Sequence, residues 1–183
     1  GEADAIVEAE YEIHQSSHCA MEPHTCMTYL DPRGRLVIRT STQVAFHVRR
    51  IVAARLQIPV QQVRVIKPRI GGGFGGKQEV LLEDICSALT LKTRQPVRLT
   101  FSHEEEFTSA TTRHSGVLKM KTGVKKDGTL IASDVKLYYD CGAYAPTPNA
   151  VWLGAISSSG AYKIPNSRVE AFSIYTNKMM GGA

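Results

Sequence analysis

The sequence predicts an α+β fold in which mixed sheets with hairpins and two main helices flank a glycine-rich loop. Three observations lead to this class. Short segments rich in β-branched residues alternate with two longer segments of helical periodicity. Turn signatures at 31–34 and 125–128 each join two candidate strands. Residues 70–78 contain five glycines, between a short strand and the second helix.

The chain begins with a strand and a hairpin. Partial alternation of apolar residues predicts a strand over 5–13. Residues 25–30 and 35–40 flank a turn in which Pro32 and Gly34 stand at positions that favour these residue types. We therefore expect these two segments to pair as a β-hairpin.

A helix follows the hairpin and ends at Pro59. Either hydroxyl of Ser41 and Thr42 is placed to cap its start. One face of the helix is apolar and consists of Val44, Val48, Ile51, Val52 and Leu56.

The middle of the chain holds the glycine loop and the second helix. Residues 63–66 form the short strand that enters the loop, and the helical pattern covers 80–91. A strand over 97–101 then precedes an acidic turn at 103–106. The core stripe expected for the second helix is Leu81, Ile85, Ala88 and Leu89.

The remainder is mostly strand. Residues 115–123 and 129–139 form a second hairpin, and 173–176 form a last strand. The segment 140–160 is rich in Gly, Ala, Pro and Ser, so we expect it to be irregular.

The glycine loop is the strongest candidate for a binding site. Glycine accepts positive φ and lets another group approach the backbone, at an entropic cost to folding. Because the second helix begins about where the glycines end, its unpaired N–H groups and positive dipole end face the same space. This arrangement favours an anionic, phosphate-bearing ligand over a purely structural tight turn.

Composition is typical of a globular protein. The 183 residues allow one domain or two small ones, and 43% hydrophobic with 21% charged residues argue against disorder. No apolar run approaches the roughly 20 residues that cross a bilayer, and no basic-then-apolar leader is present. We expect a cytoplasmic protein without membrane contact. Its four cysteines have neither a CxxC nor an iron–sulfur spacing and are expected to be unpaired thiols.

The formal net charge is +5, and ten basic residues lie between Arg33 and Lys77. The cluster lacks interleaved aromatic residues and any nucleic-acid motif, so we expect no nucleic-acid partner. A solvated face, or a face docked on acidic protein or on cofactor phosphate, is favoured. His14, His18 and His24 are interpreted as loop histidines instead of metal ligands.

Two nucleotide motifs nearly fit the loop. Gly71-x-Gly73-x-x-Gly76 satisfies the dinucleotide fingerprint, but the acid expected about 20 residues on is missing. The P-loop pattern fits through Lys77, but Gln78 stands where Ser or Thr must reach magnesium. A nucleotide-binding module is therefore kept as an alternative.

A longer set of motifs matches a known family. Residues 71–77, with Ser41-Thr42-Gln43 upstream, resemble the molybdenum-binding catalytic region of the xanthine dehydrogenase/aldehyde oxidase family of molybdenum hydroxylases. The resemblance covers nearly the whole chain and implies that residues 1–183 are the N-terminal part of a molybdenum-cofactor-binding domain, a fragment of a longer catalytic subunit. Further stretches similar to the family, in the same order, are 2–8, 21–24, 94–98, 112–114 and 160–166.

The resemblance implies roles for the loop residues. Gln43 would be the glutamine whose amide donates to the apical oxygen on molybdenum. Phe74 and Gly75 would contact the metal–dithiolene centre through the backbone, with Gly73 and Gly76 giving the clearance. Gln43 and Phe74 would thus contact the molybdenum centre indirectly.

Departures from the family pattern bear on the substrate. Gln78 follows the loop where purine-oxidising members carry a substrate-binding glutamate. Near Trp152 and Leu153, where such members place an arginine, this chain has none until Arg168. Both departures favour another aromatic heterocycle or an aldehyde over xanthine, with Gln78 as a substrate-binding residue.

The resemblance also implies what lies outside these residues. The glutamate that activates the oxygen nucleophile, and most contacts to the pterin pyrophosphate, come later in the family, so we assign no catalytic residue and expect the chain to be inactive alone. The implied cofactor is molybdenum–molybdopterin, with or without a cytosine nucleotide, while 2Fe-2S and FAD are carried by partner domains or subunits. A non-catalytic assembly domain is the remaining alternative.

Overall fold

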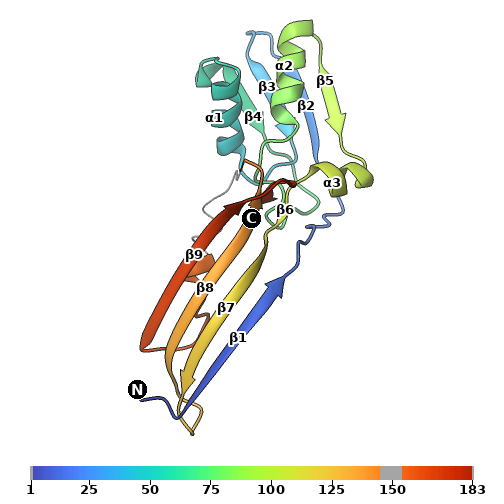
Figure 1. The fold of residues 1–183 in the computed structure, drawn as a ribbon. Coiled ribbons are helices and arrows are strands. Elements are labelled where there is room, and N and C mark those ends of the chain that lie inside the picture. Colours follow the sequence, from blue (N-terminus) through green and yellow to red (C-terminus); the bar gives the residue numbers. More distant parts are fainter. Residues whose placement is uncertain (1, 145–153, 183) are drawn as a thin grey trace. The chain divides into compact units, whose positions relative to one another are not determined.

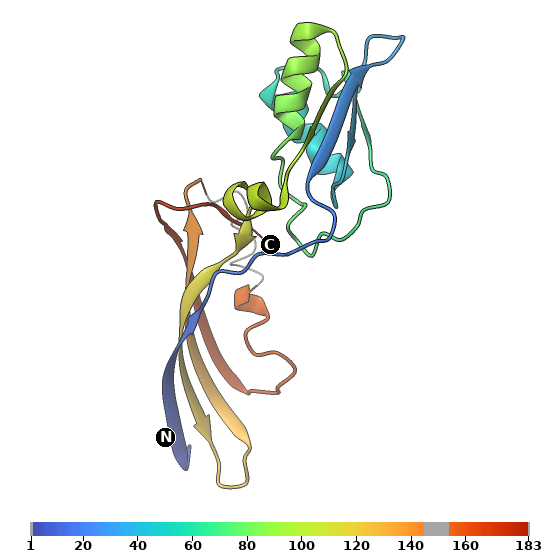
Figure 2. The same cartoon turned by 90° about the vertical axis from the view of Figure 1, so that its right-hand side faces the viewer.

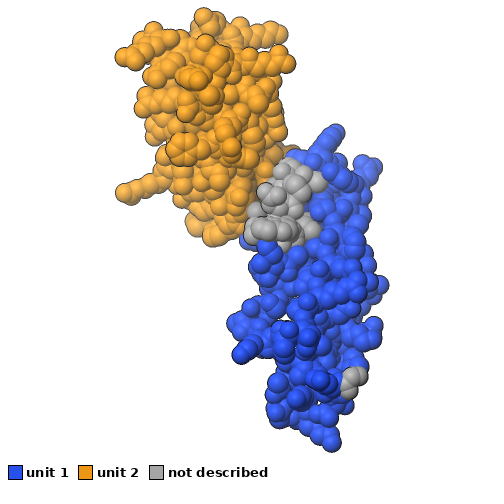
Figure 3. Space-filling model, turned by 90° about the vertical axis from the view of Figure 1, so that its left-hand side faces the viewer, with its two compact units in different colours: residues 1–16, 112–183 blue, residues 17–111 orange. Residues whose placement is uncertain are grey.

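The computed structural model describes residues 2–144 and 154–182 (Figure 1). The chain divides into two compact units, one formed by residues 1–16 and 112–183 and the other by residues 17–111 (Figure 3). Both units contain a four-stranded sheet, and the helices α1 to α3 belong to the second unit. The expected α+β class is confirmed. No helix in the described ranges is long and apolar enough to cross a membrane.

In the unit of residues 17–111, helices α1 and α2 cover one face of a mixed sheet whose strand order is β4-β3-β2-β5 (Figures 1 and 2). The predicted hairpin is confirmed, because β2 and β3 pair antiparallel around the turn at 31–34. Its elements are β2 (Thr25–Leu30), β3 (Leu36–Thr40), α1 (Ala45–Arg55), the 3-10 turn η1 (Val60–Gln62), β4 (Val63–Ile66), α2 (Glu83–Thr93), β5 (Val97–Thr100) and α3 (His103–Ser109).

The core of this unit lies between the sheet and the two helices. Val48 and Val52 of α1 are fully buried, as the predicted apolar face requires. Successive side chains along each strand point alternately to this core and to the outer face, as the pleat of a sheet dictates. The sheet contributes Cys26, Leu36, Ile38 and Val63 to this cluster.

The predicted core stripe of α2 is wrong. Ile85 and Leu89 are 51% and 45% exposed, while the buried face of the helix carries Cys86, Ser87 and Thr90. The Thr28 hydroxyl lies 2.7 Å from that of Thr90 and donates to the Cys86 carbonyl at 2.9 Å. These bonds satisfy the Thr28 and Thr90 hydroxyl groups inside the unit, whereas the buried Ser87 hydroxyl has no hydrogen-bond partner among the described residues.

Two local predictions need correction. The acidic segment 103–106 is the first part of α3, not a turn, because Ser102 and Glu105 form a capping box at its start. Neither Ser41 nor Thr42 is the N-cap of α1, since that position is Val44. The Thr42 hydroxyl, two residues before the cap, accepts the N–H of Val44 itself at 3.1 Å.

The unit of residues 1–16 and 112–183 is built on a long sheet with the order β1-β7-β8-β9 (Figure 2). The predicted strand over 5–13 and the second hairpin are confirmed. The last long strand starts earlier than predicted and pairs parallel with β8. The bounds are β1 (Ala5–Ile13), β6 (Thr112–Arg113), β7 (Ser115–Val124), β8 (Leu130–Gly142), β9 (Asn166–Tyr175) and β10 (Gly181–Gly182).

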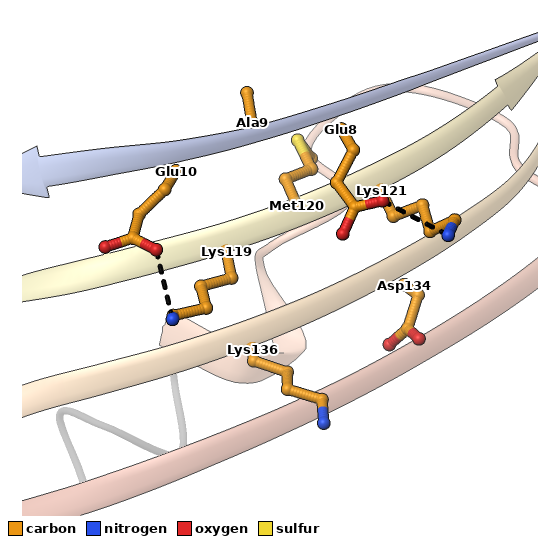
Figure 4. Close-up of a pocket in the computed structure, with 8 residues that line it drawn as sticks. All are labelled: Glu8, Ala9, Glu10, Lys119, Met120, Lys121, Asp134 and Lys136. Carbon is orange, nitrogen blue, oxygen red and sulfur yellow. Dashed lines mark ion pairs between the residues drawn. The ribbon is translucent and has the colours of Figure 1, made fainter.

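One face of this long sheet carries charges of both signs (Figure 4). Glu10 lies 3.0 Å from Lys119, and Glu8 lies 3.2 Å from Lys121, in cross-strand ion pairs between β1 and β7. These side chains are about half exposed or more, so the pairs contribute little to stability. The face is a solvated surface whose charges already balance one another.

Candidate cofactor-binding site

The glycine loop, residues 70–78, lies between β4 and α2 in the unit of residues 17–111. Side chains from two other segments hold it directly: the approach to β2 at 18–24 and the exit of β3 at 42–43. Helix α3 is linked to it through the ion pair of Glu106 with His24. The loop is therefore part of the packed structure of this unit.

Gln43 is the central support of the loop. Its side-chain oxygen Oε1 accepts hydrogen bonds from the backbone N–H groups of Gly75 at 3.0 Å and Lys77 at 3.2 Å. Its own backbone N–H donates to the Lys77 carbonyl at 2.9 Å. Two donors at one end of an amide identify that end as the oxygen, so the other end is the NH₂ group. Within the described residues this NH₂ group donates no hydrogen bond.

Three of the five glycines leave room for the chain's own side chains. A Cβ at Gly73 would lie 2.5 Å from Gln43 Oε1, and a Cβ at Gly76 would lie 2.7 Å from the His18 ring. At Gly71 the neighbour is Glu22, also at 2.7 Å. The expectation that the glycines mainly make room for a ligand is thus revised, because the chain itself fills this space.

The tip of the loop has an unusual backbone. Gly72 and Gly75 both have φ of 100°, and Phe74 between them has φ of 53°. A non-glycine residue in this region is strained, and such strain is concentrated at functional sites. The Phe74 side chain is 63% exposed. The N–H groups of Gly72 and Gly73 donate to no acceptor in the described part of the chain.

Lys77 ties the loop to Glu22, in the segment that precedes β2. Its ammonium group is 2% exposed and donates to Glu22 Oε2 at 2.8 Å and to the Glu22 carbonyl at 2.7 Å. Partial burial alone would raise the pKa of Glu22, but hydrogen bonds from Lys77 and from the Gly71 N–H outweigh it and hold this pKa below its ordinary value. The Lys77 ammonium is therefore committed to Glu22, and the P-loop role of this residue is not available.

His24 and Glu106 form a second anchor. His24 Nδ1 lies 2.9 Å from Glu106 Oε2, and Nε2 lies 3.0 Å from the Gly76 carbonyl. The His24 backbone N–H also donates to Glu106. Both ring nitrogens therefore have an oxygen partner, a carboxylate on one side and a backbone carbonyl on the other. This pair connects α3 to the loop.

The start of α2 does not serve the loop as expected. The helix begins at Glu83, beyond residues 79–82, and Glu83 is buried. Its Oε2 accepts the N–H groups of Leu81 and Leu82, both at 3.2 Å. With Glu83 and Asp84 in the first turn, the chain supplies its own negative charge to the dipole, so an anionic ligand is not required there.

The structure brings together all five predicted cofactor-binding residues, Gln43, Gly73, Phe74, Gly75 and Gly76, and places Gln78 directly after them. Gln78 is half-buried, and its N–H donates to the Gly75 carbonyl at 3.3 Å. Sequence reasoning missed Glu22, His24 and Glu106 as supports, although Glu22 and His24 lie in one of the family-like stretches. Trp152 and Leu153 lie outside the described residues.

The fold and this loop define a cofactor-binding domain of the α+β class. A family model described as "Molybdopterin cofactor-binding domain" matches residues 1–183, and the chain belongs to that family. It is not favoured as a nucleotide-binding module or a non-catalytic assembly domain.

Similar proteins are longer than this chain. It is 38% identical over 183 residues to the nicotinate dehydrogenase large molybdopterin subunit of Eubacterium barkeri, covering 100% of this chain and 43% of that protein. It is 39% identical over 183 residues to a probable hypoxanthine oxidase of Escherichia coli strain K12, covering 100% of this chain and 19% of that protein. Quinoline 2-oxidoreductase from Pseudomonas putida 86 superposes with a TM-score of 0.92 at 28% identity, covering 100% of this chain and 24% of that one. The chain thus spans less than half of these relatives.

The contact between Gly73 and Gln43 can be tested by a double-mutant cycle. Gly73→Ala should destabilise the chain because the new Cβ displaces the pinned Gln43 amide. In a Gln43→Ala background the same change should cost less, with a coupling of about 1–2 kcal/mol in urea unfolding. Gly128→Ala in both backgrounds is the control: its φ of 86° makes alanine costly there by itself, but nothing lies within 4 Å of that Cβ, so its cost should be the same with and without the Gln43 side chain. Additive effects at Gly73 and Gln43 would contradict the contact.

The ion pair of Glu22 predicts a specific pH dependence. Because the pKa of Glu22 is lowered in the folded chain from an ordinary value of 4.5, its stabilisation is complete above 4.5 and is lost as the pH falls through the lowered value. Glu22→Gln should reduce the free energy of unfolding by about 1–3 kcal/mol at neutral pH, with a deficit that shrinks below pH 4.5. The same change at exposed Glu104 should have little effect, and an equal deficit at every pH for Glu22→Gln would refute the assignment.

Proposed function

We propose that this chain is the molybdenum-cofactor-binding portion of a hydroxylase that oxidises an aromatic heterocycle or an aldehyde, with water as the oxygen source. When bound, the molybdenum cofactor accepts the two electrons removed from the substrate and delivers the oxygen. The residues of this chain bind and orient that cofactor, and the remainder of the enzyme lies in additional polypeptide. Domain bounds of 1–183, as the first part of the cofactor-binding domain, are part of this proposal.

The orientation of the Gln43 amide carries the proposal. Two loop N–H groups hold its oxygen, so its NH₂ group is a fixed donor beside the glycine loop. A donor held in this way needs no reorganisation when an oxygen atom of a ligand arrives. We infer that Gln43 offers this NH₂ to an oxygen atom of the bound cofactor.

The backbone at the tip of the loop is also suited to bind the cofactor. The N–H groups of Gly72 and Gly73 lack an acceptor within residues 2–144 and 154–182, and unpaired backbone donors next to each other attract an anionic ligand. A negatively charged cofactor centre would provide an acceptor for these two N–H groups. We infer that Gly73, Phe74, Gly75 and Gly76 bind this centre through the backbone.

Gln78 supports a substrate other than xanthine. An amide both donates and accepts hydrogen bonds, whereas a carboxylate only accepts, so the two side chains select different ring edges. The relatives named for nicotinate and for quinoline are named for aromatic nitrogen heterocycles, and another is named for hypoxanthine. We therefore propose that Gln78 contacts a non-purine heterocycle or an aldehyde.

Electrons must leave the site once the substrate is oxidised. We propose that 2Fe-2S and FAD groups on partner domains or subunits accept them. The cofactor carries either molybdopterin alone or its cytosine dinucleotide form, and the enzyme acts in the cytoplasm. Iron, flavin and nucleotide analysis of the purified complex tests this set, and absence of iron and flavin would exclude these partners.

Gln43→Glu in the full-length protein tests the proposed donor directly. Glutamate keeps an oxygen for the N–H groups of Gly75 and Lys77 but loses the NH₂ group. We expect the fold and the molybdenum content to be retained, and turnover to fall about 10²–10³-fold. The same change at exposed Gln62 is the control. Full activity with glutamate at position 43 would contradict the donor role, and absence of molybdenum from the well-folded wild-type protein would overturn the proposed function.

Gln78→Glu tests the proposed substrate contact. If Gln78 contacts the substrate, the carboxylate should raise kcat/KM for hypoxanthine relative to nicotinate by about tenfold or more, since one hydrogen-bonded contact changes selectivity by at least that factor. The measurement is kcat/KM for both compounds in the two proteins. An unchanged ratio would exclude Gln78 from the substrate site.

A further inference from the structure

The basic residues of the unit of residues 17–111 include two distinct groups in the structure. Several are committed to partners within the unit of residues 17–111. Arg35 pairs with Asp31 at 2.8 Å, Arg55 pairs with Asp84 at 2.5 Å, and Lys77 pairs with Glu22. Arg49 donates to the carbonyl groups of Val60 and Val63. Partners within the unit therefore account for the positions of these four basic side chains.

A second group of arginines gathers on the outer face of the sheet β4-β3-β2-β5, the face that α1 and α2 do not cover. Arg39 of β3 and Arg98 of β5 are both directly opposite Met27 of β2. Arg64 of β4 is opposite Val37 of β3, two residues before Arg39. Because residues directly opposite each other in a sheet project to the same face, these three arginines share one surface.

No carboxylate balances this surface. Arg39, Arg64 and Arg98 are exposed, and none of them forms an ion pair within the described residues. The contrast with the long sheet of the other unit is clear, since there the lysines of β7 lie against glutamates of β1 (Figure 4). The outer arginine face, Arg39, Arg64 and Arg98, is therefore a region of unbalanced positive charge.

Apolar side chains lie between these arginines. Ile66, Arg39, Met27 and Arg98 form one row across the four strands, so apolar and cationic residues alternate along it. A shallow cleft of about 290 Å³ lies over this row, lined by Met27, Arg39, Pro68 and Arg98 among others. Arginine and methionine are enriched in protein–protein interfaces, which combine an apolar centre with charged groups around it.

We propose that the outer arginine face is a docking surface for an acidic segment of a separate partner protein. Adjacent strands lie about 4.8 Å apart, so Arg39 and Arg98, two strands apart, are separated by roughly 10 Å. Two partner carboxylates with a similar separation match the two arginines. An apolar side chain between these carboxylates contacts Met27. The planar guanidinium groups can bind such carboxylates through two parallel hydrogen bonds.

Electrostatics favours an acidic partner over a neutral one. Two cations about 10 Å apart repel each other weakly in water, and the repulsion grows several-fold when water is excluded because the effective dielectric constant falls. A neutral surface that excluded water here would therefore raise the repulsion without any compensation. Carboxylates on the partner replace this repulsion with attraction.

The chemistry of the face also favours a separately folded partner over permanent packing by the same chain. Permanent interfaces resemble a hydrophobic core, whereas interfaces between separate proteins are more polar and carry charged groups. Nucleic acid fits less well, because the exposed residues of this face include no row of aromatic side chains on which bases could stack.

The test measures binding of a fluorescein-labelled peptide of repeated Glu-Glu-Leu to the full-length protein that contains this chain. We compare wild type with the triple variant Arg39→Gln, Arg64→Gln, Arg98→Gln. Three exposed ion pairs of about 0.5–1 kcal/mol each predict a loss of about tenfold to a hundredfold in affinity. Binding should also weaken as salt is raised. The matched control removes three exposed charges elsewhere in the same unit, through Arg33→Gln, Arg50→Gln and Lys92→Gln, and should bind like wild type.

A second variant separates charge from folding. Val37 is buried beside Arg64, so loss of arginine side chains could disturb its packing. Lysine at all three positions keeps the charge and an aliphatic stem but not the planar fork, and we expect it to retain part of the affinity. Equal losses in both glutamine triples, no binding of the peptide to wild type, or tighter binding of a single-stranded DNA oligonucleotide that depends on the three arginines would each overturn the proposal.

Discussion

The paired hydrogen bonds from the Gly75 and Lys77 N–H groups to the Gln43 side-chain oxygen are the constraint on which the site depends. They place the loop against the exit of β3, and they require a glycine at position 73, where a Cβ would collide with the amide. They also fix which end of Gln43 is the donor. A single side chain thus connects the packing of the loop with the chemistry proposed for it.

Buried polar groups, in addition to the apolar core, determine how this small unit is assembled. Lys77 with Glu22, and His24 with Glu106, tie the loop to the approach of β2 and to α3. Thr28 and Thr90 join the sheet to α2 by the same principle. Such pairs stabilise little in net terms, but leaving one member buried without its partner is costly, so each pair favours one arrangement of the loop and helices over others.

Most element positions could be predicted from the sequence, because they depend on local signals. The strands at β1, β2 and β4 follow from alternation and β-branched residues, and the turn at 31–34 follows from Pro32 and Gly34. The start of α3 was predictable in principle from the capping box of Ser102 and Glu105 but was interpreted as a turn. The buried face of α2 was not predictable, since Thr90 is hydrogen-bonded inside only because Thr28 of another element lies next to it.

Residue identity and order were enough to predict a glycine loop after a short strand, to name Gln43 and residues 73–76 as candidate contacts, and to recognise the resemblance to molybdenum hydroxylases. Those conclusions depend on residue identity and order alone. The folded arrangement was needed to learn which side chains the glycines accommodate, which end of Gln43 is the donor, and which arginines have no carboxylate partner among the described residues. These depend on distances between residues far apart in the chain, and no local pattern encodes such distances.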